Sequence, residues 1–281
     1  MPSFGPENNP ALTDDEIEKV IQFVRSFCEE KDKWPSGEFN FARPMFTEKS
    51  FPEDEAVNMV FINTDGTPGL TNHLIVEKRY GAQTNIELRF RGQLKQDGAG
   101  TWMGGVGDTS FELKKSVYLN NKSGTLLAWG NEITLPTGDS RRGMGNGITK
   151  YESFLSLGQV LPKKSYIQTQ LGFEGPPFRR HDTKAEIYTR TAVGKAFNFD
   201  KGYGRLFNVA NEFVGIREFG PRERWTLDLV PQIQFSISKR QHMRIGIGYR
   251  VPVMNVGSRQ SQLITYLLWD MFDGKFTEGW R

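Results

Sequence analysis

The chain has 281 residues, of which 37% are apolar and 12% aromatic, and its 36 basic and 33 acidic side chains leave a formal charge of +3. No apolar run approaches the roughly 20 residues that a membrane-spanning helix needs, and Met1 to Pro6 has neither the basic start nor the apolar core of a secretory signal peptide. The single cysteine, Cys28, excludes an internal disulfide framework, a cysteine-rich metal site and a thiol pair for redox exchange.

The charge changes sign near residue 36. Residues 1–36 hold four Lys or Arg against eight Asp or Glu, whereas the remaining 245 residues carry a net charge of +7. A Trp-Pro-Ser-Gly sequence at 34–37 lies at this change, and residues of this kind mark boundaries. We therefore expect an N-terminal unit over residues 1–36 and a main domain over 37–281. The basic residues of the main domain are too sparse and interspersed to indicate a nucleic-acid partner.

A short α-helix is predicted to begin at Thr13. In Thr13-Asp14-Asp15-Glu16 the threonine hydroxyl can accept the Glu16 N–H while the Glu16 side chain reaches back, which is the capping box that starts helices. One stripe of this helix is then apolar at helical spacing: Ile17, Val20, Ile21, Val24 and Phe27. A single stripe of this size cannot fold alone, so the helix needs a partner.

The N-terminal unit resembles the C-terminal end of a class I c-type cytochrome. The residues that carry the resemblance are Met1-Pro2-Ser3-Phe4 and Leu12 through Phe27. It implies that Met1 is an axial ligand of haem c and that a periplasmic c-type cytochrome is a partner. The family attaches haem through Cys-x-x-Cys-His, which these 281 residues lack, and no histidine precedes His73. We therefore expect no cofactor in this chain and haem c only in a longer form; the alternative is a plain amphipathic helix.

From about Glu55 the apolar residues recur with period two. Ile86, Leu88 and Phe90, for example, alternate with Glu87 and Arg89, as in a strand with one apolar and one polar face. About twelve segments follow this pattern, several of them long for soluble strands: 55–63, 70–79, 83–91, 106–119, 124–135, 148–160, 165–174, 184–197, 204–217, 225–238, 242–253 and 260–272.

The links between these segments alternate in length. The short ones are 80–82, 120–123, 161–164, 198–203 and 239–241, whereas 92–105, 136–147 and 175–183 are long and rich in Gly, Pro and charge. Short turns on one rim, long loops on the other and an even number of strands are typical of bacterial outer-membrane barrels. Both ends of the chain would then lie on the short-turn, periplasmic side.

The polar faces of the predicted strands are strongly charged. Such side chains can pair and stay hydrated in a barrel lumen, while the apolar faces, including Leu88 and Ile247, contact outer-membrane lipid. We expect these residues to face the lumen: Glu87, Arg89, Arg91, Glu112, Lys114, Glu132, Glu152, Glu186, Arg190, Glu212, Asp228, Arg244 and Arg250. Aromatic residues near strand ends would form interfacial girdles: Tyr80, Phe90, Tyr118, Trp129, Phe173, Phe197, Trp225 and Phe272.

The main domain resembles a family of bacterial outer-membrane barrels, transporters first associated with the meta-pathway of phenol degradation, some of which are fused behind a c-type cytochrome. The motifs that carry the resemblance are Gly104–Asp108, Leu135–Asp139, Gly143–Gly147 and Trp269–Gly274. It covers nearly all of residues 37–281 and implies a transport role without indicating the substrate.

The sequence points to no enzyme. The glycines at 104–108 and 143–147 precede predicted strands, whereas a phosphate-binding loop must precede a helix. His181 and Asp182 adjoin one another, but a single His-Asp pair is frequent by chance. Three scattered histidines and one cysteine give no metal site with ligand spacing.

Together these observations predict an all-β fold, an antiparallel barrel of about twelve strands in the bacterial outer membrane with a short N-terminal α-helix in the periplasm. We expect a channel or transporter for a small solute, coupled to a periplasmic c-type cytochrome. Two alternatives stay open. One is a non-transporting structural barrel that anchors a cytochrome or another partner at the outer membrane, and the other is a soluble β-rich binding protein.

Overall fold

The computed structural model describes residues 13–26, 39–178, 184–198, 206–220, 224–238 and 241–271. They form a helix, α1 (Asp14–Ser26), two single turns of 3-10 helix, η2 (Ser140–Arg142) and η3 (Pro162–Lys164), and a sheet of thirteen strands. The strands are β1 (Glu55–Asn63), β2 (Gly69–Tyr80), β3 (Thr84–Gln96), β4 (Trp102–Val106), β5 (Thr109–Asn120), β6 (Thr125–Leu135), β7 (Lys150–Leu161), β8 (Ser165–Gly175), β9 (Glu186–Asn198), β10 (Leu206–Glu218), β11 (Thr226–Ser236), β12 (Met243–Met254) and β13 (Gln262–Asp270).

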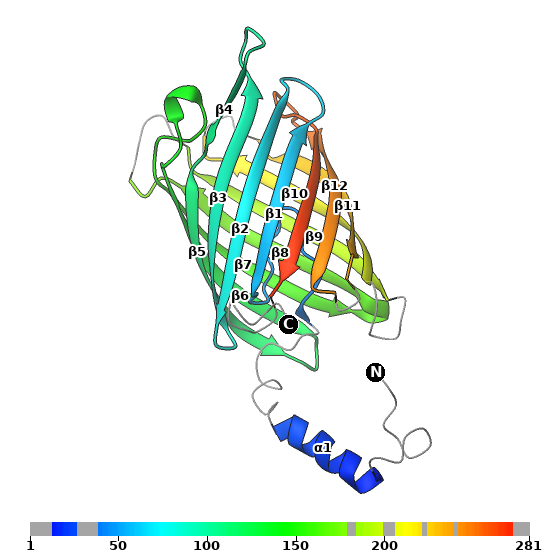
Figure 1. Cartoon of the computed structure of the whole chain (residues 1–281). Coiled ribbons are helices and arrows are strands. Elements are labelled where there is room, and N and C mark those ends of the chain that lie inside the picture. Colours follow the sequence, from blue (N-terminus) through cyan, green and yellow to red (C-terminus); the bar gives the residue numbers. More distant parts are fainter. Residues whose placement is uncertain are drawn as a thin grey trace.

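Twelve of these strands close an antiparallel barrel, as predicted (Figure 1). Each pairs with its neighbours in sequence, and β1 closes the wall by pairing with β13 from Glu55 opposite Asp270 to Asn63 opposite Gln262. Since the barrel has no free edge, the backbone hydrogen bonds of its wall are satisfied within the sheet. No helix in the described part of the chain is long and apolar enough to cross a membrane.

The two rims of the barrel differ as the link lengths predict. Links 81–83, 121–124 and 162–164 lie at one end, which we call the short-turn rim, together with the two ends of the barrel domain at Glu55 and Asp270. The opposite end, the long-loop rim, carries the links 136–149 and 176–185. The expected boundary between residues 36 and 37 lies outside the described residues.

The segment 92–105 is not the long loop that we expected. Strand β3 continues to Gln96, and β4 folds back on it with Gly92 opposite Val106 and Gln96 opposite Trp102. The carboxylate of Asp97 accepts hydrogen bonds from the N–H groups of Ala99 (2.9 Å) and Thr101 (2.8 Å), which stabilises the tight turn. The resulting hairpin projects beyond the barrel wall at the long-loop rim (Figure 1).

The outer surface of the barrel is apolar. Leu88, Phe90, Ile247 and Tyr249 point outward and are each about two-fifths exposed. Seven of the eight aromatic residues expected in interfacial girdles are exposed, and Phe272 lies outside the described residues. An exterior of this kind is suited to lipid and not to water.

Substituting Leu88 with arginine tests this outward assignment. Leu88 lies in the part of β3 that pairs with β2 and β5, so the charge would enter the lipid-facing wall, and we expect a loss of roughly 2–4 kcal/mol in unfolding free energy. The matched control is Val106→Arg, because Val106 is exposed on the β4 hairpin beyond the wall. Urea unfolding in lipid vesicles measures both. Equal losses for the two variants would contradict the assignment.

The N-terminal helix begins as the capping box predicts. The Glu16 N–H donates to the Thr13 hydroxyl (3.3 Å), and the Glu16 carboxylate accepts hydrogen bonds from the Thr13 N–H (2.8 Å) and hydroxyl (2.8 Å). Of the apolar stripe, Val20 is half exposed. Phe27 lies outside the described residues.

Acid should weaken this cap. Hydrogen bonds from the Thr13 N–H and then the Thr13 hydroxyl lower the pKa of the Glu16 carboxyl from 4.5. Because the folded-state pKa is depressed, the stabilisation is fully present above the unfolded-state pKa and is lost as the pH falls through the folded-state value. We expect the Thr13 amide NMR signal to shift below about pH 4.5 in the native protein but not in Glu16→Gln. The same titration in both proteins would contradict the cap.

Candidate functional site: a charged constriction in the barrel lumen

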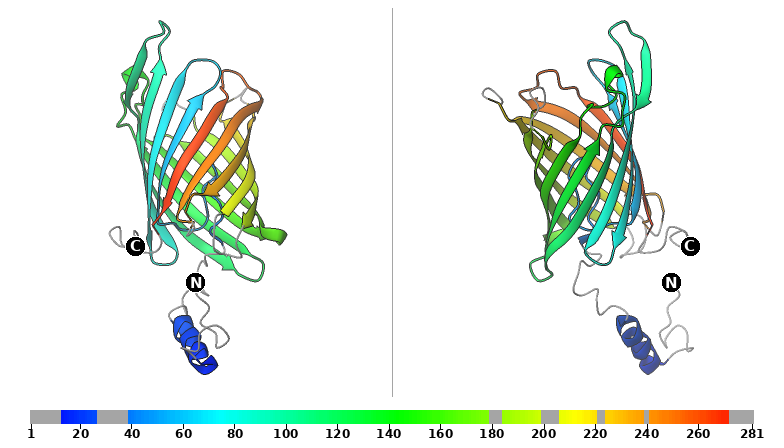
Figure 2. Two further views of the ribbon diagram at one scale, coloured as in Figure 1. Left: turned by 45° about the vertical axis from the view of Figure 1, so that its right-hand side comes forward. Right: turned by 90° about the vertical axis from the view of Figure 1, so that its left-hand side faces the viewer.

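Residues 39–54, which precede β1, lie inside the barrel; we call them the lumen segment. Almost all are buried although they belong to no strand, and their blue trace is visible through the wall in Figure 2. They contact strands at separate positions around the barrel. The Ala42 carbonyl accepts a hydrogen bond from Gln168 of β8 (2.9 Å), and the Ser50 carbonyl accepts one from Ser116 of β5 (3.0 Å). The segment therefore crosses the lumen and narrows it.

Glu212 of β10 is the main anchor of this segment. Its carboxylate accepts hydrogen bonds from the backbone N–H groups of Met45 (2.6 Å), Phe46 (3.2 Å) and Thr47 (2.8 Å), and from the Thr47 hydroxyl (2.7 Å). The Nε2 of Gln232 donates a further bond of 2.8 Å. A carboxylate with this many donors holds the segment at a defined height in the barrel.

Arg43 anchors the segment on the other side. Its guanidinium pairs with Glu55 of β1 and with Glu77 of β2 (2.5 Å), and all three side chains are buried. The carbonyl of Arg43 also accepts a hydrogen bond from the Tyr266 hydroxyl of β13 (3.0 Å). Two buried carboxylates of the barrel wall thus pair with one cation, which the lumen segment supplies.

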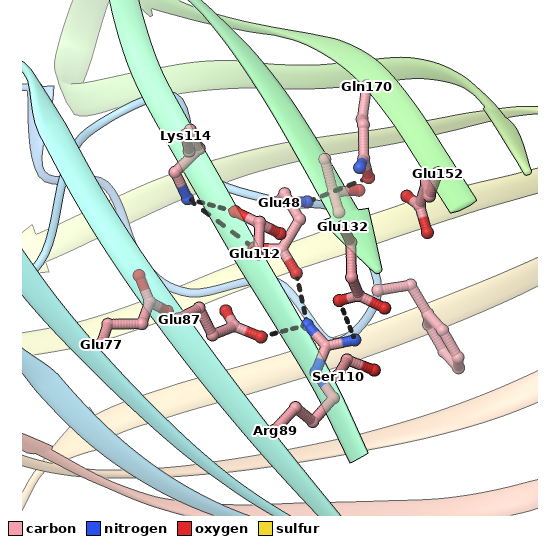
Figure 3. A network of polar contacts seen from close by, with 12 residues as sticks. Glu48, Glu77, Glu87, Arg89, Ser110, Glu112, Lys114, Glu132, Glu152 and Gln170 are labelled. Atoms are coloured by element: carbon pink, nitrogen blue, oxygen red, sulfur yellow. Dashed lines mark hydrogen bonds and ion pairs between the residues drawn. The ribbon is translucent and has the colours of Figure 1, made fainter. Parts of the chain in front are cut away.

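Glu48 joins the lumen segment to the charged wall formed by β3, β5 and β6. Arg89 lies 2.9 Å from Glu48 and 2.6 Å from Glu87, and 3.7 Å from Glu132. The Nζ of Lys114 lies 3.6 Å from Glu112 and 3.9 Å from Glu48. Figure 3 shows these carboxylates converging on the two cationic groups. The result is a compact network of paired charges between the lumen segment and the barrel wall.

Three carboxylate oxygens of this network, from Glu48, Glu87 and Glu112, lie within 4.8 Å of one another, as in some metal sites. Arg89 and Lys114, however, already pair with them. Since a divalent ion would compete with these cations for the same oxygens, we interpret the cluster as an ion-pair network. Our sequence-based expectation of no metal site stays a prediction.

A second part of the lumen wall is apolar, which the sequence analysis missed. Strands β1 and β13 carry apolar residues on both faces, so the polar-in alternation does not hold there. Their inward residues form a buried cluster with Met45 of the lumen segment and with Ile75 of β2, Val214 of β10 and Val230 of β11. The members from β1 and β13 are Val57, Met59, Phe61, Ile264, Tyr266 and Leu268. The lumen is therefore charged on one side and apolar on the other.

Two cavities remain beside the lumen segment. One, of about 290 Å³, is lined by six carboxylates and four cationic side chains, and we call it the acidic cavity. The other, of about 310 Å³, is lined by four arginines, a single carboxylate and apolar residues, and we call it the basic cavity. Glu48, Arg89 and Arg190 line both, so the cavities meet at these three side chains.

The glycine motifs build a folded loop over the acidic cavity. Asp108 accepts hydrogen bonds from the N–H groups of Gly138 (3.0 Å) and Asn146 (2.7 Å), which ties the 136–149 loop to the start of β5. A Cβ on Gly145 would lie 2.5 Å from Asp108 Oδ1, and one on Gly138 would lie 2.6 Å from the Met144 carbonyl oxygen. These glycines allow close backbone packing. Their role is structural, in agreement with our argument against a phosphate-binding loop.

All thirteen residues that we expected to face the lumen have buried or partly buried side chains. The structure brings one group together around Glu48, and the others lie apart from it along the wall. Glu87, Arg89, Arg91, Glu112, Lys114, Glu132, Glu152 and Arg190 line the acidic cavity or belong to the Glu48 network. Glu212 binds the lumen segment, Arg250 pairs with Asp228 (2.5 Å), Arg244 pairs with Asp270 (3.5 Å), and Glu186 of β9 lies opposite Glu174.

Some expected residues lie elsewhere. Met1, His181 and Asp182 lie outside the described residues, so the structure describes neither the expected haem ligand nor the His-Asp pair. The lumen segment is the functional element that the sequence analysis missed. The available signal was its composition, because four large apolar residues, Phe39, Phe41, Met45 and Phe46, precede the first predicted strand.

No protein-family model matches the sequence, and no curated protein matches it either. Among solved structures, the COG4313 outer membrane channel from Pseudomonas putida F1 has a TM-score of 0.52 at 12% identity, over 82% of this chain and 99% of that chain. The NanC porin has a TM-score of 0.50 at 11% identity, over 77% of this chain and 98% of that chain. At these identities the likeness shows the fold alone, which is that of an outer-membrane β-barrel.

Proposed function

We propose that the protein is an outer-membrane channel for a small solute. The observation that carries this proposal is the pair of cavities beside the lumen segment, because they leave space in a lumen lined with paired charges. A barrel of this size lies between eight-stranded barrels filled with side chains and open porins of about 16 strands. We therefore expect a narrow, selective path for the solute. The names of the two similar structures, a channel and a porin, agree with this role.

Reconstitution tests this function. Single-channel recordings in planar bilayers should show small, discrete conductance steps, and vesicles that contain the protein should admit small solutes and exclude larger ones. Vesicles with heat-denatured protein serve as the control. If neither ions nor solutes pass, the channel proposal is wrong.

One observation favours a second function, a non-transporting barrel that anchors a partner. The lumen segment is bound to β1, β2, β8, β10 and β13, and this number of contacts suits a permanently closed lumen. The same recordings decide between the two, since a structural barrel gives no conductance in the wild type. The apolar exterior argues against a soluble binding protein.

We infer that the partner at the short-turn rim is a periplasmic c-type cytochrome and that this rim faces the periplasm. The support is the sequence similarity of residues 1–27 to the end of a cytochrome. The chain itself does not fit a covalently held haem, because it lacks Cys-x-x-Cys-His. We therefore expect the purified chain to show no Soret absorption band, and Met1 to act as a ligand only behind upstream haem-binding sequence.

We also infer membership of the transporter family associated with the meta-pathway of phenol degradation. The support is that three of its motifs meet beside the acidic cavity: Asp108 of Gly104–Asp108 binds Gly138 of Leu135–Asp139 and Asn146 of Gly143–Gly147. A loop at the mouth of a channel is a position where a family's transport properties would be set.

A further inference from the structure

Arg190 of β9 differs from the other cationic side chains of the lumen. Within the described part of the chain, no carboxylate lies within ion-pair distance of its guanidinium. Cationic side chains that do pair with a carboxylate include Arg43, Arg89, Arg91, Lys114, Arg244 and Arg250. Arg190 thus carries a positive charge that no described side chain neutralises by direct contact.

The hydrogen bonds of Arg190 leave one edge of the guanidinium unused. Nη1 donates weakly to the Phe46 carbonyl (3.4 Å) and to Oε1 of Gln170 (3.2 Å), and the group lies over the ring of Tyr188 at 4.0 Å. Nε is buried without a hydrogen-bond partner. Nη2 donates to no described residue. Nε and Nη2 together form the fork that binds a carboxylate with two parallel hydrogen bonds.

Arg190 lies where the two cavities meet, and the basic cavity next to it is suited to an anion. Three of its four arginines are already paired, and Arg89 and Lys114 hold its one carboxylate, Glu48. Among the four arginines of the basic cavity, Arg190 is thus the one without an ion pair to a described carboxylate, and a ligand with one negative charge can supply that pair.

Part of the remaining lining of the basic cavity is apolar and aromatic, beside the polar Thr47, Thr71, His73 and Gln262. Met45, Met59 and Ile75 belong to the buried apolar wall, and the rings of Phe46 and Phe61 lie 5.9 Å apart. Its volume of about 310 Å³ lies at the lower end of the range for small-molecule sites. A compact apolar body would displace water from this wall and gain stabilisation from the burial.

We propose that the channel recognises small monocarboxylates with an apolar or aromatic body, and that Arg190 binds the carboxylate while the basic cavity holds the body. This proposal rests on the channel function and names its substrate class. It makes Arg190 the specificity-determining residue of the constriction.

Binding of benzoate to the full chain in lipid nanodiscs tests the proposal. The comparison ligands are benzyl alcohol, which keeps the ring without the charge, and acetate, which keeps the charge without the ring. Isothermal titration against empty nanodiscs should give benzoate an affinity at least about tenfold higher than either, because a paired charge and a buried ring contribute separately. Equal affinities for benzoate and benzyl alcohol would overturn it.

Variants separate Arg190 from the general charge of the barrel. Arg190→Gln keeps a donor for Phe46 but removes the charge, and we expect it to lower benzoate affinity about tenfold while benzyl alcohol is unaffected. Lys195→Gln makes the same charge change at an exposed position of the same strand and should leave benzoate binding unchanged. An unchanged benzoate affinity in Arg190→Gln overturns the role of Arg190. The wild-type ligand comparison decides the substrate class if that variant does not fold.

Conductance distinguishes this inference from the channel function. If the protein conducts ions but does not bind benzoate, the proposed substrate class is wrong. A protein that binds benzoate through Arg190 but passes no ions or solutes retains the site, and the channel function is then the part that fails.

Discussion

Replacing Glu212 with alanine is expected to release the lumen segment from β10 and to raise single-channel conductance severalfold. The carboxylate accepts hydrogen bonds from the backbone of Met45 and Thr47, from the Thr47 hydroxyl and from Gln232. Alanine leaves these buried donors without an acceptor. Hydrogen bonds to charged groups contribute about 1.5–3 kcal/mol each, so the loss of several of them weakens the attachment of the lumen segment to β10.

Glu212→Gln is the matched control for this prediction. It keeps the shape of the side chain and one acceptor oxygen, so it should hold part of the segment and conduct nearer to the wild-type level. Planar-bilayer recording of the three proteins side by side is the measurement. Wild-type conductance in a folded Glu212→Ala barrel would mean that the lumen segment does not limit the passage.

Of the single substitutions in the lumen, Arg43→Ala is expected to lower the free energy of unfolding the most. Arg43 is the cation for Glu55 and Glu77, whose side chains are 0% and 1% exposed. Removing one partner of a buried ion pair costs about 3–5 kcal/mol, because it leaves an uncompensated charge in the interior. Here two carboxylates lose their cation, so we expect the effect at the upper end of that range, as a lower midpoint in heat or urea unfolding.

Two further variants test the physical reason. Arg259→Ala also removes a partner of a buried carboxylate, Asp228, but Arg250 still lies 2.5 Å from that carboxylate, so the loss should be small. Adding Glu77→Gln to Arg43→Ala removes one of the orphaned charges and should restore part of the stability. If Arg43→Ala is no less stable than Arg259→Ala, the pairing with Glu55 and Glu77 does not anchor the segment.

The elements that could be predicted from the sequence are those that depend on local spacing. Period two in segments such as Ile86–Phe90 reflects the alternation of side chains along a strand, and it identified the barrel strands to within a few residues at most ends. The cap at Thr13 depends on residues three apart, and link length follows directly from where the strands end. Because inward and outward positions alternate, charged residues such as Glu87 and Lys114 could also be placed on the inner face.

Tertiary structure decided what fills the lumen and which charges meet. Thr47 and Glu212 lie 165 residues apart, and Arg43 and Tyr266 lie 223 apart, so no local pattern connects them. Strand β4 and the apolar inner faces of β1 and β13 were likewise missed. Strands with one apolar and one polar face are expected where the lumen holds water or charged groups. Here the lumen segment instead supplies an apolar surface against which β1 and β13 pack. Closure of the barrel around its own N-terminal residues brings Glu48, Arg89 and Arg190 together, and with them the constriction.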